Sequence, residues 1–207
     1  DGGVAIAKTR GLLLVAWMIW LMGTVHLLSF SRTGVWLVVV VMVLAAAIIW
    51  ARERVRWHGW WQQRRYVVLT TQIVFMVAYL AFVWIRAQNP DLWHPGRGGE
   101  KPMDLAFLTA VVRSPSFPPY DPWFAGGMLN YYYFGFVMIG VLVHMTGIVP
   151  STAYNLAVPT IFALTAVGAW GVALALQGSF RTIHARAWRW WLRALPYAER
   201  RKLIGAL

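Results

Sequence analysis

The sequence predicts an all-α polytopic membrane protein, because long apolar runs alternate with short polar segments. Hydrophobic residues make up 59% of the 207 residues and charged residues only 13%, and the mean hydropathy is +0.56, far from a water-soluble domain. About 20 apolar residues in a helix cross the hydrocarbon core, and a helix satisfies its own backbone there. The sequence therefore predicts about five spans, at 11–31, 33–51, 66–87, 130–149 and 153–177.

The first apolar run, 11–31, follows Lys8 and Arg10 and could be taken for a secretory signal peptide. It is longer than the apolar part of such a peptide and lacks a convincing small-residue cleavage site, so we expect a retained span. The sequence begins at Asp1 without Met, and another apolar run begins near its last residue. We therefore expect one membrane domain over residues 1–207 that is the N-terminal part of a longer protein.

The chain carries a net charge of +12 and contains no cysteine, which excludes disulfides, thiolate catalysis and cysteine-bound zinc. Its basic residues gather with tryptophans in two segments beside the spans, 52–65 and 181–202. Arginine and tryptophan together favour the membrane interface, so anionic lipid headgroups explain the charge better than nucleic acid. We predict the lipid bilayer as a partner, no nucleic-acid partner, and an amphipathic basic C-terminal segment that can lie on the membrane surface.

The number of predicted spans and the positive-inside rule disagree about the orientation of the chain in the membrane. Three predicted spans separate the segments 52–65 and 181–202, which places them on opposite faces. The positive-inside rule favours the cytoplasm for both. The count of basic residues alone slightly favours a cytoplasmic position for the loop 88–130.

The loop 88–130 holds four of the seven carboxylates, Asp91, Glu100, Asp104 and Asp121. Pro102 suits the first position of a helix, and Asp104 then lies in the first turn, where it meets the positive end of the helix dipole. Ser114 and the following proline end this helix. We therefore predict a short interfacial helix over residues 102–113.

A second start signal follows in the same loop, where Asp121 precedes a proline as a helix cap would. Two glycines after residue 125 end this segment. Between the two start signals, the prolines after Phe117 require an extended backbone. We predict a second short interfacial helix beginning at Asp121, and then the fourth span.

The loop combines its carboxylates with His94 and with nearby cations, and this mixture predicts a site. Carboxylates can hold a divalent metal or an acceptor hydroxyl, and cations can hold a phosphate. The four cations are Arg86, Arg97, Lys101 and Arg113. A structural alternative exists for each acid, because Asp121 could cap a helix, Asp104 could complement a dipole, and Glu100 could pair with a neighbouring cation.

Several rare short sequence motifs, in this loop and in the span that follows, occur in order and resemble those of a known family. They are GEKPMD from Gly99, SPSFPPYDPWFAGG from Ser114, NYYYFG from Asn130 and YNLA from Tyr154. Together they resemble the YYY membrane-protein family of Chloroflexota and archaea, which has no established activity. The layout, an acidic loop with interfacial helices between spans, is similar to that of GT-C glycosyltransferases, which use lipid-linked phosphate sugars.

This resemblance implies roles for the loop residues. Catalytic residues would be found among Asp91, Glu100, Asp104 and Asp121, and a divalent metal ion would bind to Glu100 and Asp104. The phosphate of a polyprenyl-phosphate-linked donor would contact Arg97, Lys101 and Arg113. The motif tyrosines would be Tyr120, Tyr131, Tyr132 and Tyr133. The resemblance also implies a prokaryotic plasma membrane with the loop on the extracytoplasmic side.

Two other classes of function stay open. The chain could be a non-catalytic accessory or scaffold subunit of a photosynthetic or respiratory membrane complex, contacting other subunits through its tryptophan-rich faces. His144 or His26 could then bind a pigment or haem, although lone histidines in spans more often bridge helices by hydrogen bonds. A transporter is the third candidate, because Pro159 could break the fifth span beside Asn155.

Overall fold

The computed structural model describes residues 2–94, 96 and 99–194, and it consists of helices joined by loops. The seven helices of this described part are α1 (Gly2–Ala5), α2 (Ala7–Thr24), α3 (Arg32–Arg52), α4 (Arg54–Ala87), α5 (Lys101–Arg113), α6 (Phe134–Thr146) and α7 (Pro150–Ala194). Within these residues the only β-type pairing is an isolated bridge between Tyr120 and Met128. The all-α prediction is therefore confirmed.

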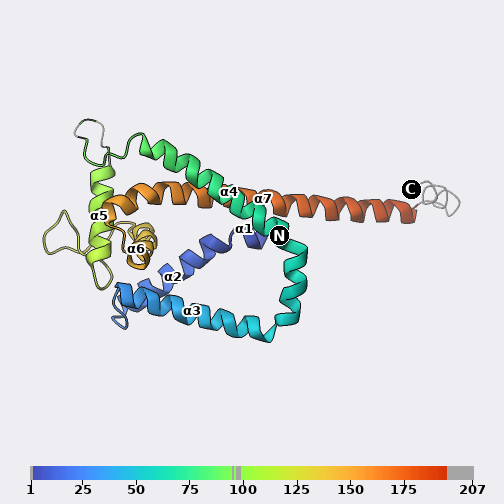
Figure 1. Cartoon of the computed structure of the whole chain (residues 1–207), viewed down its shortest axis with the longest axis horizontal. Coiled ribbons are helices and arrows are strands. Elements are labelled where there is room, and N and C mark those ends of the chain that lie inside the picture. Colours follow the sequence, from blue (N-terminus) through green and yellow to red (C-terminus); the bar gives the residue numbers. More distant parts are fainter. Residues whose placement is uncertain (1, 95, 97–98, 195–207) are drawn as a thin grey trace.

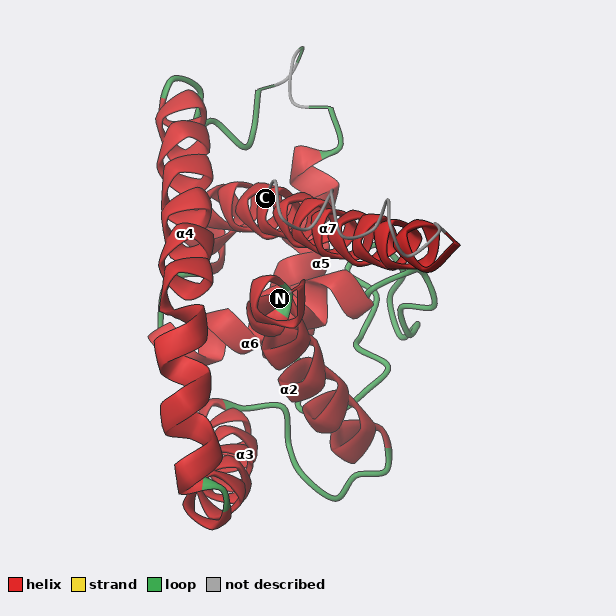
Figure 2. Ribbon diagram, turned by 90° about the vertical axis from the view of Figure 1, so that its right-hand side faces the viewer, coloured by secondary structure: helices red, strands yellow, loops and turns green. Residues whose placement is uncertain are grey.

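Two ends of the molecule differ in what they contain (Figure 1). At one end, which we call the loop end, α5 lies across the ends of the long helices together with the segments 25–31, 88–94 and 114–133. At the other, the basic end, α3 meets α4 and the chain begins with α1, which contacts α4 and α7. Figure 2 views the molecule from the basic end, nearly along α7, and shows α4 upright with α1 close to both helices.

Within the described residues, three helices are long and apolar enough to cross a membrane, at Arg32–Arg52, Gly59–Ala87 and Pro150–Gln177. They correspond to the predicted spans 33–51, 66–87 and 153–177. The predicted count of about five spans is not confirmed. The predicted first span, 11–31, becomes α2, which has 18 residues and already ends at Thr24. Its first turn carries two basic side chains, Lys8 and Arg10, and this helix is not among the three.

The predicted fourth span, 130–149, becomes the shorter apolar helix α6. Its 13 residues extend only about 20 Å, against the roughly 30 Å of a bilayer core. The helix begins late because Tyr133 is fixed in a turn, where its hydroxyl accepts a hydrogen bond of 3.1 Å from Trp20 Nε1. It ends at Gly147, which has a φ of +76°. Figure 1 views α6 nearly end-on, across the direction of α3 and α7.

This short helix changes the predicted relation between the two basic segments. Only the spans in α4 and α7 then separate residues 52–65 from the part of α7 that follows Gln177. Two crossings return the chain to the same face, and Figure 1 shows both segments leading away from the loop end. The side chains of 178–194 and all of 195–207 lie outside the described residues, so the amphipathic C-terminal segment stays a prediction.

The main hydrophobic core lies near the loop end, between α2, α3, α5 and α6. Its buried members include Ile19, Val35, Val111 and Val141, together with Phe30 from the turn after α2. Small residues permit close packing there: a Cβ on Gly140 would lie 2.9 Å from Phe30 Cζ. The loop end is therefore held by dense packing, which gives the neighbouring polar residues a fixed framework.

The loop between α5 and α6 contains one confirmed and one corrected expectation. The first predicted helix forms as α5, which ends at Arg113 with Ser114 as its C-cap, and its interfacial position stays a prediction. The second, expected from Asp121, does not form, and the chain makes a hairpin-like loop instead. Asp121 N donates to Gly127 O (3.0 Å) and Leu129 N to Pro119 O (2.8 Å). Gly126, with a φ of +77°, permits this turn.

Candidate functional site: a cationic cleft at the start of α5

A cleft of about 380 Å³ lies where the end of α4, the start of α5 and the start of α7 meet. Each helix contributes polar side chains here because each begins or ends at the loop end. The cleft is lined by Phe82, Ile85, Arg86, Asn89, Lys101, Tyr154 and Val158. Two cations therefore face one small space near the predicted loop site.

Arg86 is the most unusual group of the cleft. Its Nη1 donates to the backbone carbonyl of Asn89 at 2.9 Å. Its Nε and Nη2 atoms are buried and find no hydrogen-bond partner among the residues that the structure describes. A buried donor without a partner is costly, and a guanidinium is shaped to bind a carboxylate or phosphate through two parallel hydrogen bonds. The cleft is therefore suited to an anion.

Lys101 adds a second positive charge at the first residue of α5. Its Nζ donates to the backbone carbonyl of Asp91 at 3.3 Å, which ties the preceding loop to the helix. A cation at the N-terminus of a helix opposes the helix dipole, so this position favours an anion twice, through the side chain and through the dipole. Lys101 was among the predicted phosphate residues, and it lines the cleft.

Asp104 lies one turn further along α5 and has a defined partner. The hydroxyl of Tyr154 donates to Asp104 Oδ2 at 3.1 Å. Tyr154 also packs against a small apolar cluster formed by Leu108, Ile139 and Ala157. The packing fixes the tyrosine, and the tyrosine orients the carboxylate, which leaves Oδ1 for another group.

The motif tyrosines Tyr131 and Tyr132 lie on the exposed side of the same region. Their ring centroids are 3.8 Å apart, and Tyr131 also approaches Phe107 of α5 at 6.4 Å. A hydrogen bond with the Tyr131 hydroxyl raises the pKa of Tyr132, and the charges of Glu100 and Asp104 add to this shift. Tyr132 is therefore a protonated donor within the electrostatic reach of both acids at neutral pH.

Two of the predicted acids, Asp91 and Asp121, have local partners instead. Asp91 Oδ1 accepts from Trp93 N at 2.9 Å, and Asp121 Oδ1 accepts from Trp123 N at 2.8 Å. Each carboxylate thus closes its own turn, in the way typical of aspartate in loops. Among the described residues, no three histidine, aspartate or glutamate side chains lie close enough to hold a metal ion. The metal assignment to Glu100 and Asp104 stays a prediction.

The predicted phosphate residues are also divided. Lys101 begins α5 and Arg113 ends it, so about 18 Å of helix separates their backbones. They cannot share one phosphate group. Arg97 lies outside the described residues.

The remaining predicted residues have mainly structural surroundings. Tyr133 binds Trp20 and stacks on Phe117 with a centroid distance of 6.1 Å. Tyr120 is 41% exposed and forms one side of the hairpin-like loop. Both help to hold the loop between α5 and α6 on the ends of the long helices, away from the cleft.

The two histidines considered as cofactor ligands differ in their surroundings, since His144 is partly enclosed and His26 is exposed. The ring of His144 meets Phe30 edge-on at 4.6 Å, and its Nε2 is buried without a hydrogen-bond partner among the described residues. His26 sits in the turn after α2 with a φ of +56°. The pigment or haem role stays a prediction.

Two residues of the site, Tyr154 and Asn155, were not predicted for it, and Arg86 was predicted only within the group of four cations able to hold a phosphate. Asn155 Nδ2 donates to the carbonyl of Pro90 at 3.1 Å and thereby fixes the loop to α7. Tyr154 and Asn155 could have been found from the sequence, because both belong to the motif YNLA of the family resemblance.

These observations define a polytopic helical membrane protein with a polar site at one end of its helix bundle. The chain matches a family model, the uncharacterized membrane protein family DUF2298, over residues 14–205, and it belongs to this family. The resemblance to the YYY family agrees with this match. No curated protein and no solved structure matches the chain. The likeness to GT-C glycosyltransferases is not confirmed by these comparisons.

Proposed function

We propose that this chain forms part of a membrane-embedded transferase of the GT-C glycosyltransferase type, which takes a sugar from a lipid-linked phosphate donor. One observation carries the proposal. Arg86 lines the same cleft as Lys101 with two guanidinium nitrogens, Nε and Nη2, that have no hydrogen-bond partner among the described residues, and Tyr154 joins this cleft to the carboxylate of Asp104. An anion site beside an oriented carboxylate is what transfer from a phosphate requires.

The position of the cleft suits a lipid-linked phosphate. The cleft opens where the spans in α4 and α7 end and begin, at the level where α5 lies across the bundle. A lipid-linked phosphate has its charge at the membrane surface and its chain in the hydrocarbon core. Arg86, in the last turn of its span, can reach the surface with its charged group while its stem stays in apolar surroundings.

The chemistry follows from the two kinds of group. As the acceptor oxygen bonds to the anomeric carbon of the sugar, Asp104 takes the hydroxyl proton through the oxygen that Tyr154 leaves free. The bond between that carbon and the phosphate oxygen breaks, and its electron pair passes to the phosphate. Arg86 and Lys101 stabilise the added negative charge.

A divalent ion would fit this scheme with Glu100 and Asp104 as its protein ligands. The two acids stand one helical turn apart at the start of α5, a spacing at which side chains can meet. Two carboxylates plus phosphate oxygens and waters are a common set of ligands for Mg²⁺. A bound ion would supply charge neutralisation on the phosphate.

The orientation that we propose places the loop end outside the cytoplasm of a prokaryotic plasma membrane. With α6 too short to cross, the segments 52–65 and 178–194 fall on one face. The positive-inside rule then assigns both to the cytoplasm, and the conflict between the two basic segments disappears. Cysteine substitution at exposed positions such as Trp123 and Trp57, with a membrane-impermeant thiol reagent on intact cells, tests this: labelling of residue 57 alone would overturn it.

The direct test uses the full-length protein in membrane vesicles with radiolabelled polyprenyl-phosphate sugars. Arg86→Gln should reduce transfer at least 100-fold, because it removes a charged hydrogen-bonding partner of the phosphate. The matched control is Arg113→Gln, at the other end of α5, which should keep wild-type transfer. Equal transfer by wild type and Arg86→Gln would overturn the proposal.

A second candidate, an accessory or scaffold subunit of a membrane complex, is supported by the exposure of the spans. Only 17% of the apolar window of α3 and 6% of that of α4 is buried within the chain. Such faces can contact lipid or other helices. This candidate gains if the full-length protein transfers no sugar and cysteines placed along α3 cross-link to another subunit in native membranes.

A further inference from the structure

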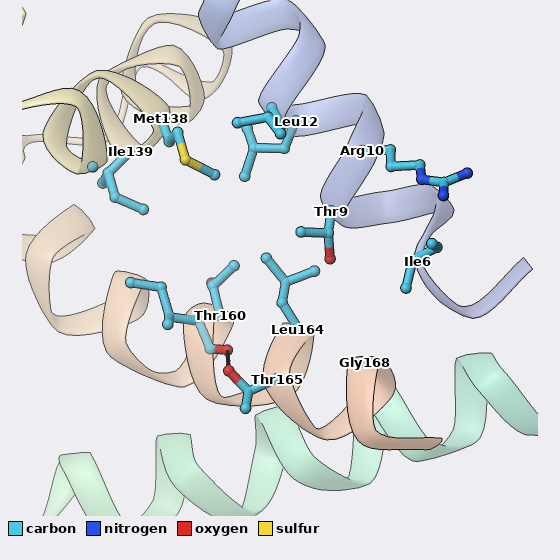
Figure 3. A pocket seen from close by; sticks show the side chains of 13 residues that line it. Ile6, Thr9, Arg10, Leu12, Met138, Ile139, Thr160, Leu164, Thr165 and Gly168 are labelled. Atoms are coloured by element: carbon cyan, nitrogen blue, oxygen red, sulfur yellow. Dashed lines mark hydrogen bonds between the residues drawn. The ribbon is translucent and has the colours of Figure 1, made fainter. Parts of the chain in front are cut away.

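A second cavity, separate from the cationic cleft, lies between the start of α2, the first turns of α6 and the middle of α7 (Figure 3). Its volume is about 540 Å³. Leu12, Met138 and Leu164 point into it from the three helices, and Arg10 stands at its edge near the start of α2. We call it the apolar crevice.

The lining of the apolar crevice is complementary to a hydrocarbon chain. Two of its three threonines use their hydroxyls within α7, because Thr160 Oγ1 donates to Leu156 O at 2.8 Å and Thr165 Oγ1 to Ile161 O at 2.9 Å. Apart from Arg10 and the hydroxyl of Thr9, the described lining then presents mainly methyl, methylene and thioether surface. A polar ligand placed inside would lose its hydrogen bonds with water and regain few of them.

The charge at the edge of the crevice is equally informative. Arg10 is exposed and is the one charged residue of the described lining. It lies at the basic end, near a cleft lined by Lys8, Arg64 and a group of tryptophans. Along α7 the crevice extends inward from Gly168 to Thr160, a depth of about 12 Å. A ligand with an anionic head and an apolar chain matches this arrangement.

We infer that the apolar crevice binds one anionic phospholipid from the leaflet at the basic end. Its chain lies between α2, α6 and α7, and its phosphate contacts Arg10. Bound in this way, the lipid fills the space between α2 and α7 and connects the N-terminal helix to the rest of the bundle. This site is distinct from the cationic cleft and does not depend on the transferase proposal.

The experiment measures lipid retention by native mass spectrometry of the full-length protein in detergent. Three probes separate the parts of the ligand: phosphatidylglycerol, a diacylglycerol with the same chains, and inorganic phosphate. Phosphatidylglycerol should be retained at one molecule per chain. The diacylglycerol should bind about fivefold more weakly, the effect of one arginine near an anionic headgroup, and inorganic phosphate should not be retained.

Two kinds of variant assign the binding to this crevice. Arg10→Gln should abolish the fivefold preference for phosphatidylglycerol, and Arg10→Lys should keep it. Leu164→Trp should fill the crevice and reduce retention of both lipids at least tenfold. The control Leu176→Trp, at a position of α7 that is 52% exposed, should bind like wild type.

A second occluding variant guards against a folding defect in the first. Gly168→Leu adds a side chain where a Cβ would meet nothing within 4 Å, so the helix packing need not move. It should reduce retention as Leu164→Trp does, with an unchanged unfolding temperature in lipid-free detergent. Wild-type retention of phosphatidylglycerol by Arg10→Gln, Leu164→Trp and Gly168→Leu would overturn the inference. A disulfide in native membranes between a cysteine placed at residue 164 and a cysteine of another protein would also overturn it.

Discussion

Lysine and arginine side chains have different surroundings at the two ends of the molecule. In the cationic cleft at the loop end, Arg86 and Lys101 share a small space with Tyr154, which holds the carboxylate of Asp104. At the basic end, Lys8 lies 3.9 Å from the ring centre of Phe75, and burial lowers the pKa of this lysine. The first arrangement gathers hydrogen-bonding groups around one small space, and the second places charge among aromatic rings, as at a membrane interface.

This difference teaches that the number of basic residues is a poor guide to the site. The basic end is rich in arginine, and Arg64 there lies 6.0 Å from the ring centre of Trp60. The loop end has fewer cations but combines them with acids and tyrosines. Chemistry is therefore expected at the loop end, and lipid attraction at the basic end.

The strongest way to break this comparison is Asp104→Asn. Removal of a general base reduces rates by about 100-fold to 10,000-fold, so sugar transfer by the full-length protein should fall into that range. Asp121→Asn is the matched control, since that acid closes a turn of the exposed hairpin-like loop and asparagine closes the same turn. Equal loss in both variants would mean that the loop as a whole, and not the cleft, decides activity.

The second prediction separates hydrogen-bond geometry from charge. Arg86→Lys keeps the charge but loses the planar fork, so affinity for a polyprenyl phosphate should fall by about 10-fold to 100-fold. Arg64→Lys makes the same change at the basic end and should leave this affinity unchanged. Titration of the purified full-length protein with a fluorescent polyprenyl phosphate measures both. An unaffected Arg86→Lys variant would show that the cleft recognises only charge.

Part of this architecture could be predicted from local sequence, and part could not. The helix α5 was predicted because Pro102, Asp104 and Ser114 act on their own neighbours. The length of α6 was not, because its start depends on Tyr133 and its partner Trp20, 113 residues away in sequence. The role of Arg86 likewise depends on α7, which lines the same cleft although it is distant from Arg86 in the sequence. Local signals thus predicted elements, and the site required contacts between distant segments.

The third prediction concerns the packing of the two ends. Gly140→Leu would press its side chain against Phe30 in the core near the loop end and should destabilise the protein by about 1–3 kcal/mol. Gly11→Leu, near the basic end, meets nothing within 4 Å and should change the free energy of unfolding by less than about 0.5 kcal/mol. Thermal unfolding in one detergent compares them. Similar destabilisation by both variants would contradict a core concentrated at the loop end.

The smallest expected effect tests whether Tyr154 orients Asp104 or takes part in binding. Tyr154→Phe removes one hydrogen bond to a carboxylate and keeps the packing against Leu108. A loss of about 1 kcal/mol should appear as a roughly fivefold lower kcat for sugar transfer. KM should stay within about twofold, because the phosphate is held by Arg86 and Lys101. A raised KM with unchanged kcat would instead make Tyr154 a ligand of the donor, and Asp104 would then need another group to fix its orientation.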